Sequence, residues 1–423
     1  MSTSDSARNH RRKFSVFFVP AVACLAASVG LTAALPELPS DPITRLAGRL
    51  ERGEVTLEYR EGEGYLRDLL KALDVNTDSQ TLVFSKTSFQ QAIINPRNPR
   101  AVYFNDEVSV GNVPGGDVHE LLALEAGGQG MVFYSMSSKK VDRPRLQRRG
   151  IECLFCHAMG NKGAPSLVVA SVIPDQDGTP AYTSTFISTI DHRTPLEQRW
   201  GGWYVTGTHG SQKHLGNAVA PDPLHPLDLQ EEGSQNLKNL EGKFDTSKHL
   251  TGTSDIVALM TLEHQVGMAN RLNAVAFQYA RFKRDGLSDA DWTELDADID
   301  DIVGYMLFVD EARLAEPVTG VSTFTHTFAD RGPRDSRGRS LRDFDLQTRL
   351  FRHPLSYMVY SALFDGMPSP VLDRIYQRLY DVLTNRETGP KYAQLSTTDR
   401  RALFEILVET KPNLPAYWTA SAR

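Results

Sequence analysis

The chain has 423 residues, of which 46 are Lys or Arg and 52 are Asp or Glu, and its formal net charge is -6 at pH 7. This length leaves room for more than one hydrophobic core, and the composition is that of neither a disordered nor a fibrous protein. The negative charge gives no general attraction for nucleic acid or for anionic lipid, so we expect no nucleic-acid partner.

The N-terminal segment has the pattern of an export signal. Basic residues within Arg8–Lys13 precede a stretch, Phe14–Pro36, that contains no charged residue. The apolar run is long enough to span a bilayer, while Ala33 and Ala34 suit a signal peptidase, so a retained inner-membrane anchor and a cleaved signal both stay open. Residues 1–36 therefore predict an exported, periplasmic protein.

Residues 37–140 are expected to form a mixed α/β region. The pattern predicts a helix around Tyr65–Leu73 and short β-like runs at Thr81–Phe84, Ala101–Phe104 and Met131–Tyr134, separated by Gly and Asn/Pro turns. We therefore expect a mainly α protein with a smaller β component in its N-terminal half.

Two cysteines stand close together in Cys153–His157, which reads C-L-F-C-H. This is the C-x-x-C-H pattern of c-type haem attachment, in which each thiol bonds to one haem vinyl group and the histidine binds the iron. The third cysteine, Cys24, lies in the apolar export segment, where an ordinary signal residue explains it better than a lipoprotein site. The sequence thus predicts one covalent haem c, attached through Cys153 and Cys156, with His157 as the proximal iron ligand.

Three other interpretations of this motif compete with haem attachment. A chain with three Cys and eleven His shows the pattern by chance on the order of once in two thousand cases. A zinc knuckle needs a second ligand pair, and the sequence has no second Cys pair. A thioredoxin-like redox motif would lie among alternating strands and helices, and it does not require a histidine after the second cysteine. Haem attachment is the interpretation that we adopt.

The haem-binding region is expected to span residues 141–315. A long stretch, Gly160–Leu250, has no helical period and is predicted to form a loop that walls the haem pocket. Within it, the tryptophans and glycines of Arg199–Gly210 suit either porphyrin packing or ordinary core packing. A basic approach to the motif suits haem propionates, an acidic redox partner or a solvated turn. Its residues are Arg143, Arg145, Arg148 and Arg149.

The clearest helix begins near Ser254 and runs through Gln265. Its apolar face carries His264, and Gly267 beside it allows another group, such as a haem edge, to lie close to the helix backbone. We predict His264 as the first candidate for the distal iron ligand, and a hydrogen-bonded core histidine is the competing role. The other distal candidates are His209, His214, Met260, Met268 and Met358.

Most of the remainder of the chain is predicted to be helical, apart from a polar linker or surface loop at about Glu316–Arg342. Ser288 with Asp291 three residues later is a capping-box pattern that starts a packing helix. Residues 341–423 form a predicted C-terminal helical region, with helices over Val371–Leu383 and Thr398–Val408. Ser396 with Asp399 three residues later is the capping-box pattern that starts the second of these. The apolar stripe of the first of these three helices contains Leu295, Ile299, Ile302, Val303, Met306 and Leu307.

Several segments resemble those of one group of proteins. They are Tyr103–Asp106, Cys153–His157, Arg199–Gly210, Glu263–Gln265 and Arg349–Pro354. Together they resemble uncharacterised exported bacterial cytochrome c domain proteins, over most of the mature chain. The resemblance implies redox chemistry and a cytochrome c-like haem-binding core with large additions. Di-haem peroxidases and thiosulfate dehydrogenases differ, because they carry two attachment motifs where this chain has one.

We expect a c-type cytochrome that transfers electrons in the periplasm to or from a redox partner protein. The alternative is a mono-haem oxidoreductase whose open distal site takes peroxide or a small nitrogen or sulfur compound. In that alternative His209 and His214 act as acid and base and Arg199 polarises a bound oxygen species, whereas hydrogen bonding within the loop is the competing role of both histidines. Whether the protein is an enzyme stays open at this point.

Overall fold

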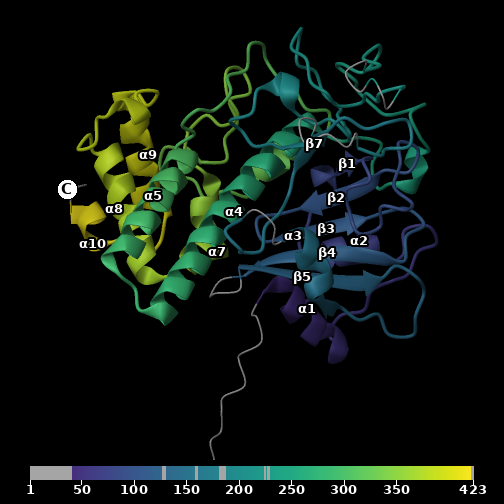
Figure 1. The fold of residues 1–423 in the computed structure, drawn as a ribbon, viewed down its shortest axis with the longest axis horizontal. Coiled ribbons are helices and arrows are strands. Elements are labelled where there is room, and N and C mark those ends of the chain that lie inside the picture. The colour runs from purple at the N-terminus through teal and green to yellow at the C-terminus, as the bar shows by residue number, and fades with distance from the viewer. Residues whose placement is uncertain are drawn as a thin grey trace, which may run out of the picture. The chain divides into compact units, whose positions relative to one another are not determined.

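A seven-stranded antiparallel sheet lies at the centre of the N-terminal half (Figure 1). The computed structural model describes residues 41–125, 130–157, 161–180, 187–222, 225 and 229–420. The strand order is β6-β5-β4-β3-β2-β1-β9, and β7 pairs with β8 in a separate two-stranded sheet. The strands are β1 (Thr81–Val83), β2 (Arg100–Phe104), β3 (Val108–Asn112), β4 (Val118–Glu125), β5 (Gly130–Ser137), β6 (Gln147–Arg149), β7 (Ala170–Val172), β8 (Ile187–Thr189) and β9 (Trp203–Tyr204).

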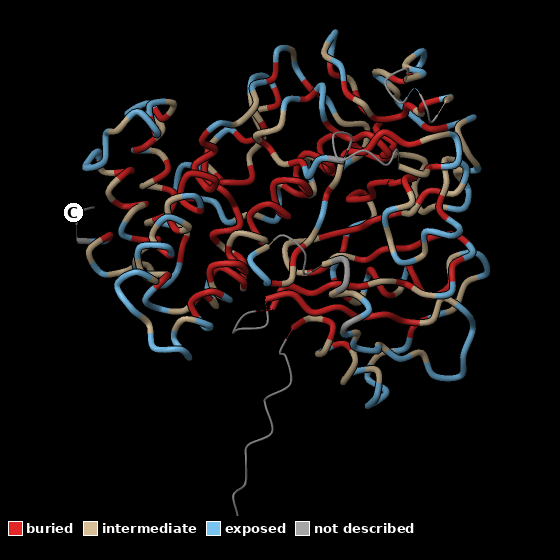
Figure 2. The backbone as a smooth tube through the Cα atoms, viewed as in Figure 1, coloured by how far each residue is buried: buried red, intermediate tan, exposed pale blue. Residues whose placement is uncertain are grey.

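Both faces of the large sheet are covered, because successive side chains of a strand point to opposite faces. Tyr103, Leu121 and Tyr134 belong to the cluster that packs under α1 (Pro42–Glu51) and α2 (Leu66–Ala72). The neighbouring strand residues face the larger apolar cluster, which includes the long helix α4 (Ile256–Asp285). Figure 2 shows the buried residues, in red, along the strands of the sheet and along α4.

The helix α4 connects the sheet to the C-terminal helices. It contacts β5 and α5, α5 contacts α8, and α8 contacts α9, and Figure 1 shows α4 running between the sheet and these helices. The remaining helices are α3 (Ile151–His157), α5 (Asp289–Met306), α6 (Phe324–Asp330), α7 (Ala362–Asp365), α8 (Ser369–Leu383), α9 (Thr397–Thr410) and α10 (Ala416–Ala420). Short 3-10 turns are η1 (Thr77–Ser79), η3 (Leu196–Gln198), η4 (Thr246–Lys248), η5 (Tyr357–Tyr360) and η6 (Pro390–Tyr392).

The start of α4 is fixed by hydrogen bonds from three directions. Asp255 is its N-cap and accepts from the backbone N–H of Val257 at 2.8 Å, so the cap lies one residue after the predicted cap at Ser254. The second oxygen of Asp255 accepts from the backbone N–H groups of Val321 and Ser322, both at 2.8 Å. The hydroxyl of Ser254 accepts from the backbone N–H of Leu82 in β1 at 2.9 Å. One helix end thus holds both the sheet and a distant loop.

The predicted fold, mainly α around a cytochrome c-like core, is wrong. Helices account for 36% of the chain and strands for 15%, and the N-terminal half is built on the antiparallel sheet, unlike the small all-α fold of a cytochrome c. The sequence predicted β1, β2 and β5 of this sheet but not β3, β4, β6 or β9. The longest of the unpredicted strands is β4, whose sequence V-H-E-L-L-A-L-E is rich in helix-forming residues. Because β4 pairs with β3 and β5 along both edges, and its second half is buried throughout, tertiary packing overrides that propensity.

The helices predicted from local signals are confirmed. α2, α5, α8 and α9 lie where the patterns placed them, and Ser288 and Ser396 both form complete capping boxes with the aspartate three residues later. The predicted apolar stripe of α5 is buried along its whole length.

The predicted regions 37–140, 141–315 and 341–423 contribute to one compact unit of the structure. Contacts group Pro39–Arg423 in one unit, and β9 from the middle region pairs with β1 of the N-terminal sheet. The predicted export segment, residues 1–36, lies outside the described residues. Within the part of the chain that the structure describes, no helix combines the length and the apolar character needed to cross a membrane.

Candidate functional site

The predicted attachment motif lies on the short helix α3, directly after the edge strand β6. Residues three and four apart are neighbours on a helix, so the helical backbone brings positions 153, 156 and 157 to one side. Cys153 is half-buried and packs against the large apolar cluster together with Leu154. The side chain of Cys156 lies outside the described part of the structure. The local geometry therefore gathers the three motif positions beside an apolar core.

His157 is held by the loop that follows α3. Its Nδ1 lies 2.7 Å from the carbonyl oxygen of Ser166, and the backbone N–H of Ser166 donates in return to the carbonyl of His157 at 2.5 Å. The ring also packs on Phe133 of β5, with 4.8 Å between the ring centroids. Because a carbonyl oxygen only accepts, Nδ1 carries the proton, and the lone pair of the neutral ring is on Nε2. Burial lowers the pKa of His157, which favours this neutral form.

Two asparagines of α4 fix the loop that holds His157. Asn270 accepts from the backbone N–H of Leu167 and donates to its carbonyl, both at 2.8 Å. Asn273 donates to the carbonyl of Pro165 at 2.6 Å. Ser166, whose carbonyl receives the Nδ1 proton, lies between these two anchored residues. The orientation of His157 is therefore set by α4 through the loop.

Replacing Asn270 with alanine is expected to lower the free energy of unfolding by about 1–2 kcal/mol, because two partly buried hydrogen bonds are lost and the backbone of Leu167 loses both partners. Denaturant titration followed by circular dichroism measures the change. The exposed Asn239 provides the matched control, since Asn239→Ala should change stability by less than about 0.5 kcal/mol. Equal stability of the two variants would contradict the anchoring role.

His264 is buried and hydrogen-bonded at both ring nitrogens. Its Nδ1 lies 2.9 Å from Nδ1 of His192, and its Nε2 lies 2.8 Å from the hydroxyl oxygen of Ser356. The rings of Tyr305 and Phe308 stack on it, with centroids 5.3 and 4.5 Å away. Burial lowers the pKa of His264 to about 3. In this structure His264 is a hydrogen-bonded core histidine, which was the competing role, and binding of the iron by His264 stays a prediction.

Arg199 is the cation of a buried ion pair that the sequence did not reveal. It binds Glu263 directly, and Trp200 donates to the other oxygen of that carboxylate at 3.1 Å. Nε of Arg199 donates to the carbonyl of Thr194 at 2.6 Å, and its Nη2 donates to the carbonyl of His192 at 3.1 Å. Burial raises the pKa of Glu263 to about 7, although Arg199 opposes the shift. All these bonds make Arg199 a structural residue rather than one available to polarise a ligand.

His209 and His214 lie side by side in buried loop structure, with 4.8 Å between their ring centroids. Nδ1 of His209 donates to the carbonyl of Gln212 at 2.7 Å, and its Nε2 accepts from the backbone N–H of Asn236 at 3.2 Å. Nδ1 of His214 accepts from the backbone N–H of Gly216 at 3.0 Å. Both histidines therefore serve the loop conformation. The three methionines considered as distal ligands, Met260, Met268 and Met358, are buried in the large apolar cluster.

The basic approach to the motif is mostly exposed. Arg143, Arg145 and Arg148 are exposed, whereas Arg149 is half-buried and donates to the hydroxyl of Ser135 at 2.7 Å. Contact with propionates or with an acidic partner stays a prediction for these residues. Across the described ranges, no group of three or more His, Cys, Asp or Glu side chains is arranged to hold a metal ion.

Comparison with known proteins gives no relative: no family model, no curated protein and no solved structure matches the chain.

Proposed function

We propose that the protein is a periplasmic electron-transfer protein that carries one haem c, attached through Cys153 and Cys156 and bound at the iron by His157. The observation that carries the proposal is the hydrogen bond from Nδ1 of His157 to the carbonyl of Ser166. Histidine ligands commonly donate their second ring N–H to a carbonyl, which fixes the tautomer and directs the other nitrogen to the metal.

The surroundings of the motif fit the group that it would hold. Cys153 and Leu154 pack against the apolar cluster, and Phe133 covers the ring of His157, so the neighbours of the motif are the apolar and aromatic groups that a porphyrin prefers. When bound, haem c supplies an Fe(III)/Fe(II) couple. The chain itself contributes the ligand nitrogen, the carbonyl that increases its basicity, and the rigid loop behind it.

Electron transfer is favoured over the oxidoreductase alternative by the state of the other histidines. Catalysis at an open distal site would need an acid and a base within reach of the bound molecule. The residues predicted for those roles, His209 and His214, are buried and hydrogen-bonded within their loop. Arg199 is likewise committed to Glu263.

Haem staining after denaturing electrophoresis tests the attachment. The parent protein, expressed with its export segment in a bacterium that assembles c-type cytochromes, should give a stained band from the periplasmic or membrane fraction. Cys153→Ser together with Cys156→Ser should remove the stain, because no thioether can form. The third cysteine provides the control, since Cys24→Ser should stain like the parent. Full staining of the double variant would overturn the proposal.

An absorption spectrum of the stained parent protein separates the two functions. A reduced spectrum that carbon monoxide leaves unchanged supports the carrier, since all six iron positions are then occupied. A shift on binding carbon monoxide would instead assign an open site and the oxidoreductase.

A further inference from the structure

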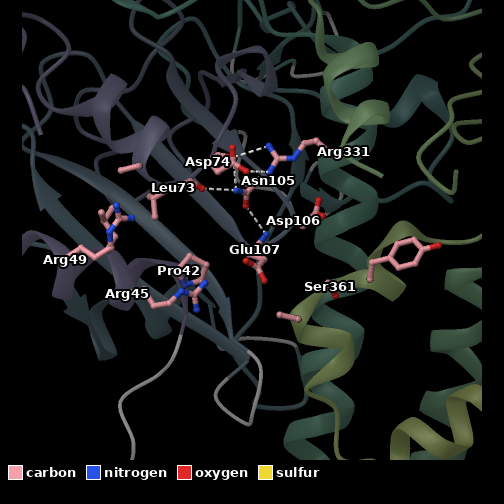
Figure 3. A pocket seen from close by; sticks show the side chains of 14 residues that line it. Pro42, Arg45, Arg49, Leu73, Asp74, Asn105, Asp106, Glu107, Arg331 and Ser361 are labelled. Atoms are coloured by element: carbon pink, nitrogen blue, oxygen red, sulfur yellow. Dashed lines mark hydrogen bonds and ion pairs between the residues drawn. The ribbon is translucent and has the colours of Figure 1, made fainter. Parts of the chain in front are cut away.

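The charged groups around the cavity beside α1 mostly compensate each other (Figure 3). Arg331 forms an ion pair with Asp74 at 2.5 Å. Burial raises the pKa of Glu107, and the nearby Arg45 opposes that shift. The cavity, of about 480 Å³, thus offers a charged ligand little that the protein has not already paired. A group of cations without partners lies instead between β5 and the haem motif.

These cations belong to Lys139–Arg149, termed the basic segment, which includes the edge strand β6. The segment carries six Lys or Arg and one Asp, a local charge of +5 in a chain whose net charge is -6. Lys140, Arg143 and Arg145 are exposed and form no ion pair within the part of the chain that the structure describes. Charge on a strand edge protects it from aggregation, but these three cations precede β6, so that explanation does not cover them.

The basic segment lies directly beside the haem motif. Arg149 of β6 is paired in register with Phe133 of β5, and the ring of Phe133 packs on that of His157 with 4.8 Å between the centroids. Neighbouring strands are about 4.8 Å apart, so β6 and His157 both flank β5 at the same residue. Only Gly150 separates β6 from α3. The segment therefore adjoins the motif both along the chain and across the sheet edge.

The nearest anions along the chain do not cancel the charge of the basic segment. Glu152 of α3 lies 3.7 Å from Arg149, and Asp117 pairs with Lys139 at 2.7 Å. Asp142 is the one anion within the segment itself, and the three unpaired cations outnumber it. The surface beside the motif therefore keeps a positive excess.

Apolar side chains are exposed around the loop that holds His157. Among the described residues five large apolar side chains are exposed, and two of them, Val168 of this loop and Phe277 of α4, are 49% and 40% exposed. Phe277 lies 3.7 Å from where a β-carbon of Gly163, in the same loop, would stand. A third, Val141, belongs to the basic segment. Because protein interfaces combine an apolar centre with a polar rim, this surface has both components of one.

We propose that the basic segment is the docking surface for an acidic redox partner protein, which exchanges an electron with the haem from this side of the molecule. The inference rests on the proposed function. A positive surface on a negatively charged protein orients an acidic partner during encounter, because the rest of the molecule repels that partner. An anionic membrane would meet the same charge, but a bilayer bound here would shield the motif from any soluble partner.

Two triple variants of the full exported protein test the proposal. The segment variant combines Lys140→Gln, Arg143→Gln and Arg145→Gln. The control variant removes three exposed cations from other parts of the chain, which also form no ion pair within the described residues. Its substitutions are Arg97→Gln, Lys238→Gln and Arg352→Gln. Both variants have the same net charge, so a difference between them reports the position of the charge. Exposed substitutions of this kind change stability by less than about 0.5 kcal/mol.

Retention on immobilised polyglutamate measures the surface without any haem-dependent readout. The parent protein should be retained at low ionic strength and released by salt, because salt screens the attraction between charges. The control variant should be retained like the parent, whereas the segment variant should pass through the column. Equal elution of the two variants would overturn the proposal.

Two small oxidants of opposite charge report on the haem-loaded protein. The reduced protein passes one electron to ferricyanide or to tris(phenanthroline)cobalt(III), as its Fe(II) becomes Fe(III). At low ionic strength the segment variant should react about tenfold more slowly with ferricyanide than the control variant does, and faster with the cobalt complex. A change in reduction potential, expected if these cations bind haem propionates, would shift both rates in the same direction and would refute the docking surface.

Sedimentation with phosphatidylglycerol vesicles examines the competing anionic surface. Sedimentation that only the segment variant loses, together with equal ferricyanide rates in both variants, would assign the segment to a membrane and contradict the proposal. Failure of the proposed function has a different signature, which is absence of the haem stain while retention on polyglutamate persists. Haem stain without any difference between the two triple variants refutes the docking surface alone.

Discussion

Replacing Arg199 with methionine is expected to lower the free energy of unfolding by about 3–5 kcal/mol, because the buried carboxyl group of Glu263 loses its cation and must either stay charged in the core or take up a proton at pH 7. Arg199 is 2% exposed and Glu263 is fully buried. The loss also removes the donors to the carbonyls of Thr194 and His192. Guanidinium chloride unfolding of the variant and the parent at pH 7 measures the difference.

The double variant Arg199→Met with Glu263→Gln separates the charge effect from the packing effect. It should recover most of the lost stability, because a neutral amide needs no counter-ion and can still accept from Trp200. Arg337, whose side chain is 60% exposed in its pair with Glu405, serves as the surface control, since Arg337→Met should cost less than about 1 kcal/mol. An Arg199→Met variant within about 1 kcal/mol of the parent would contradict this account.

Acidification from pH 6.5 to 4.5 is expected to lower the free energy of unfolding by about 5 kcal/mol, at roughly 1.4 kcal/mol per pH unit for each net proton. Burial lowers the pKa of His119 to about 4 and that of His214 and His264 to about 3, and it holds the pKa of His192 well below its usual value. A histidine whose folded pKa is depressed stabilises the fold above its unfolded pKa and loses that contribution as pH falls. As the pH falls through this window, the unfolded chain therefore binds protons at these histidines that the folded chain does not bind.

Two buried glutamates oppose this loss of stability and reduce the net number of protons that are taken up on unfolding. Burial raises the pKa of Glu263 and of Glu311 to about 7, so the folded chain binds these two protons first as pH falls. These four histidines against two glutamates leave at least about two net protons in this window, because the pKa values of His157, His209, His249 and His353 are lowered as well. Denaturant midpoints across the pH series measure the slope, and His119→Gln should reduce it by about 1.4 kcal/mol per pH unit. Constant stability over the window would refute the assignment.

Local signals in the sequence predicted the helices and three strands of the large sheet, β1, β2 and β5, but not its other four strands. The capping boxes at Ser288 and Ser396 are complete within four residues, so the pattern alone specifies those helix starts. β4 carries helix-forming residues, and its conformation depends on pairing with β3 and β5. Such pairing cannot be read from a single segment.

In the candidate site, too, contiguous residues were predicted from the sequence, whereas contacts between residues far apart in the chain were not. The motif positions of α3 are contiguous and were found directly. The hydrogen-bond partners of His264 are His192 and Ser356, which lie 72 and 92 residues away in the chain. The apolar periodicity of α4 therefore indicated that His264 is buried, but it did not indicate these hydrogen bonds. Gly267 does allow a close approach to α4, as predicted. The group that approaches it is the hydroxyl of Tyr305, which lies 2.0 Å from where a β-carbon would stand.

The two ends of the large sheet bear on how the protein behaves at high concentration. One edge strand, β9, has two residues, and the other, β6, has three, two of them arginines. Unpaired strand edges recruit strands from other molecules and start aggregation, and short or charged edges suppress that recruitment. Of the two eight-residue strands, which are the longest of this sheet, β4 is paired on both sides, and β6 covers Phe133–Ser135 at the middle of β5. The edges of the sheet thus offer other copies of the chain only short or charged strands and the two ends of β5.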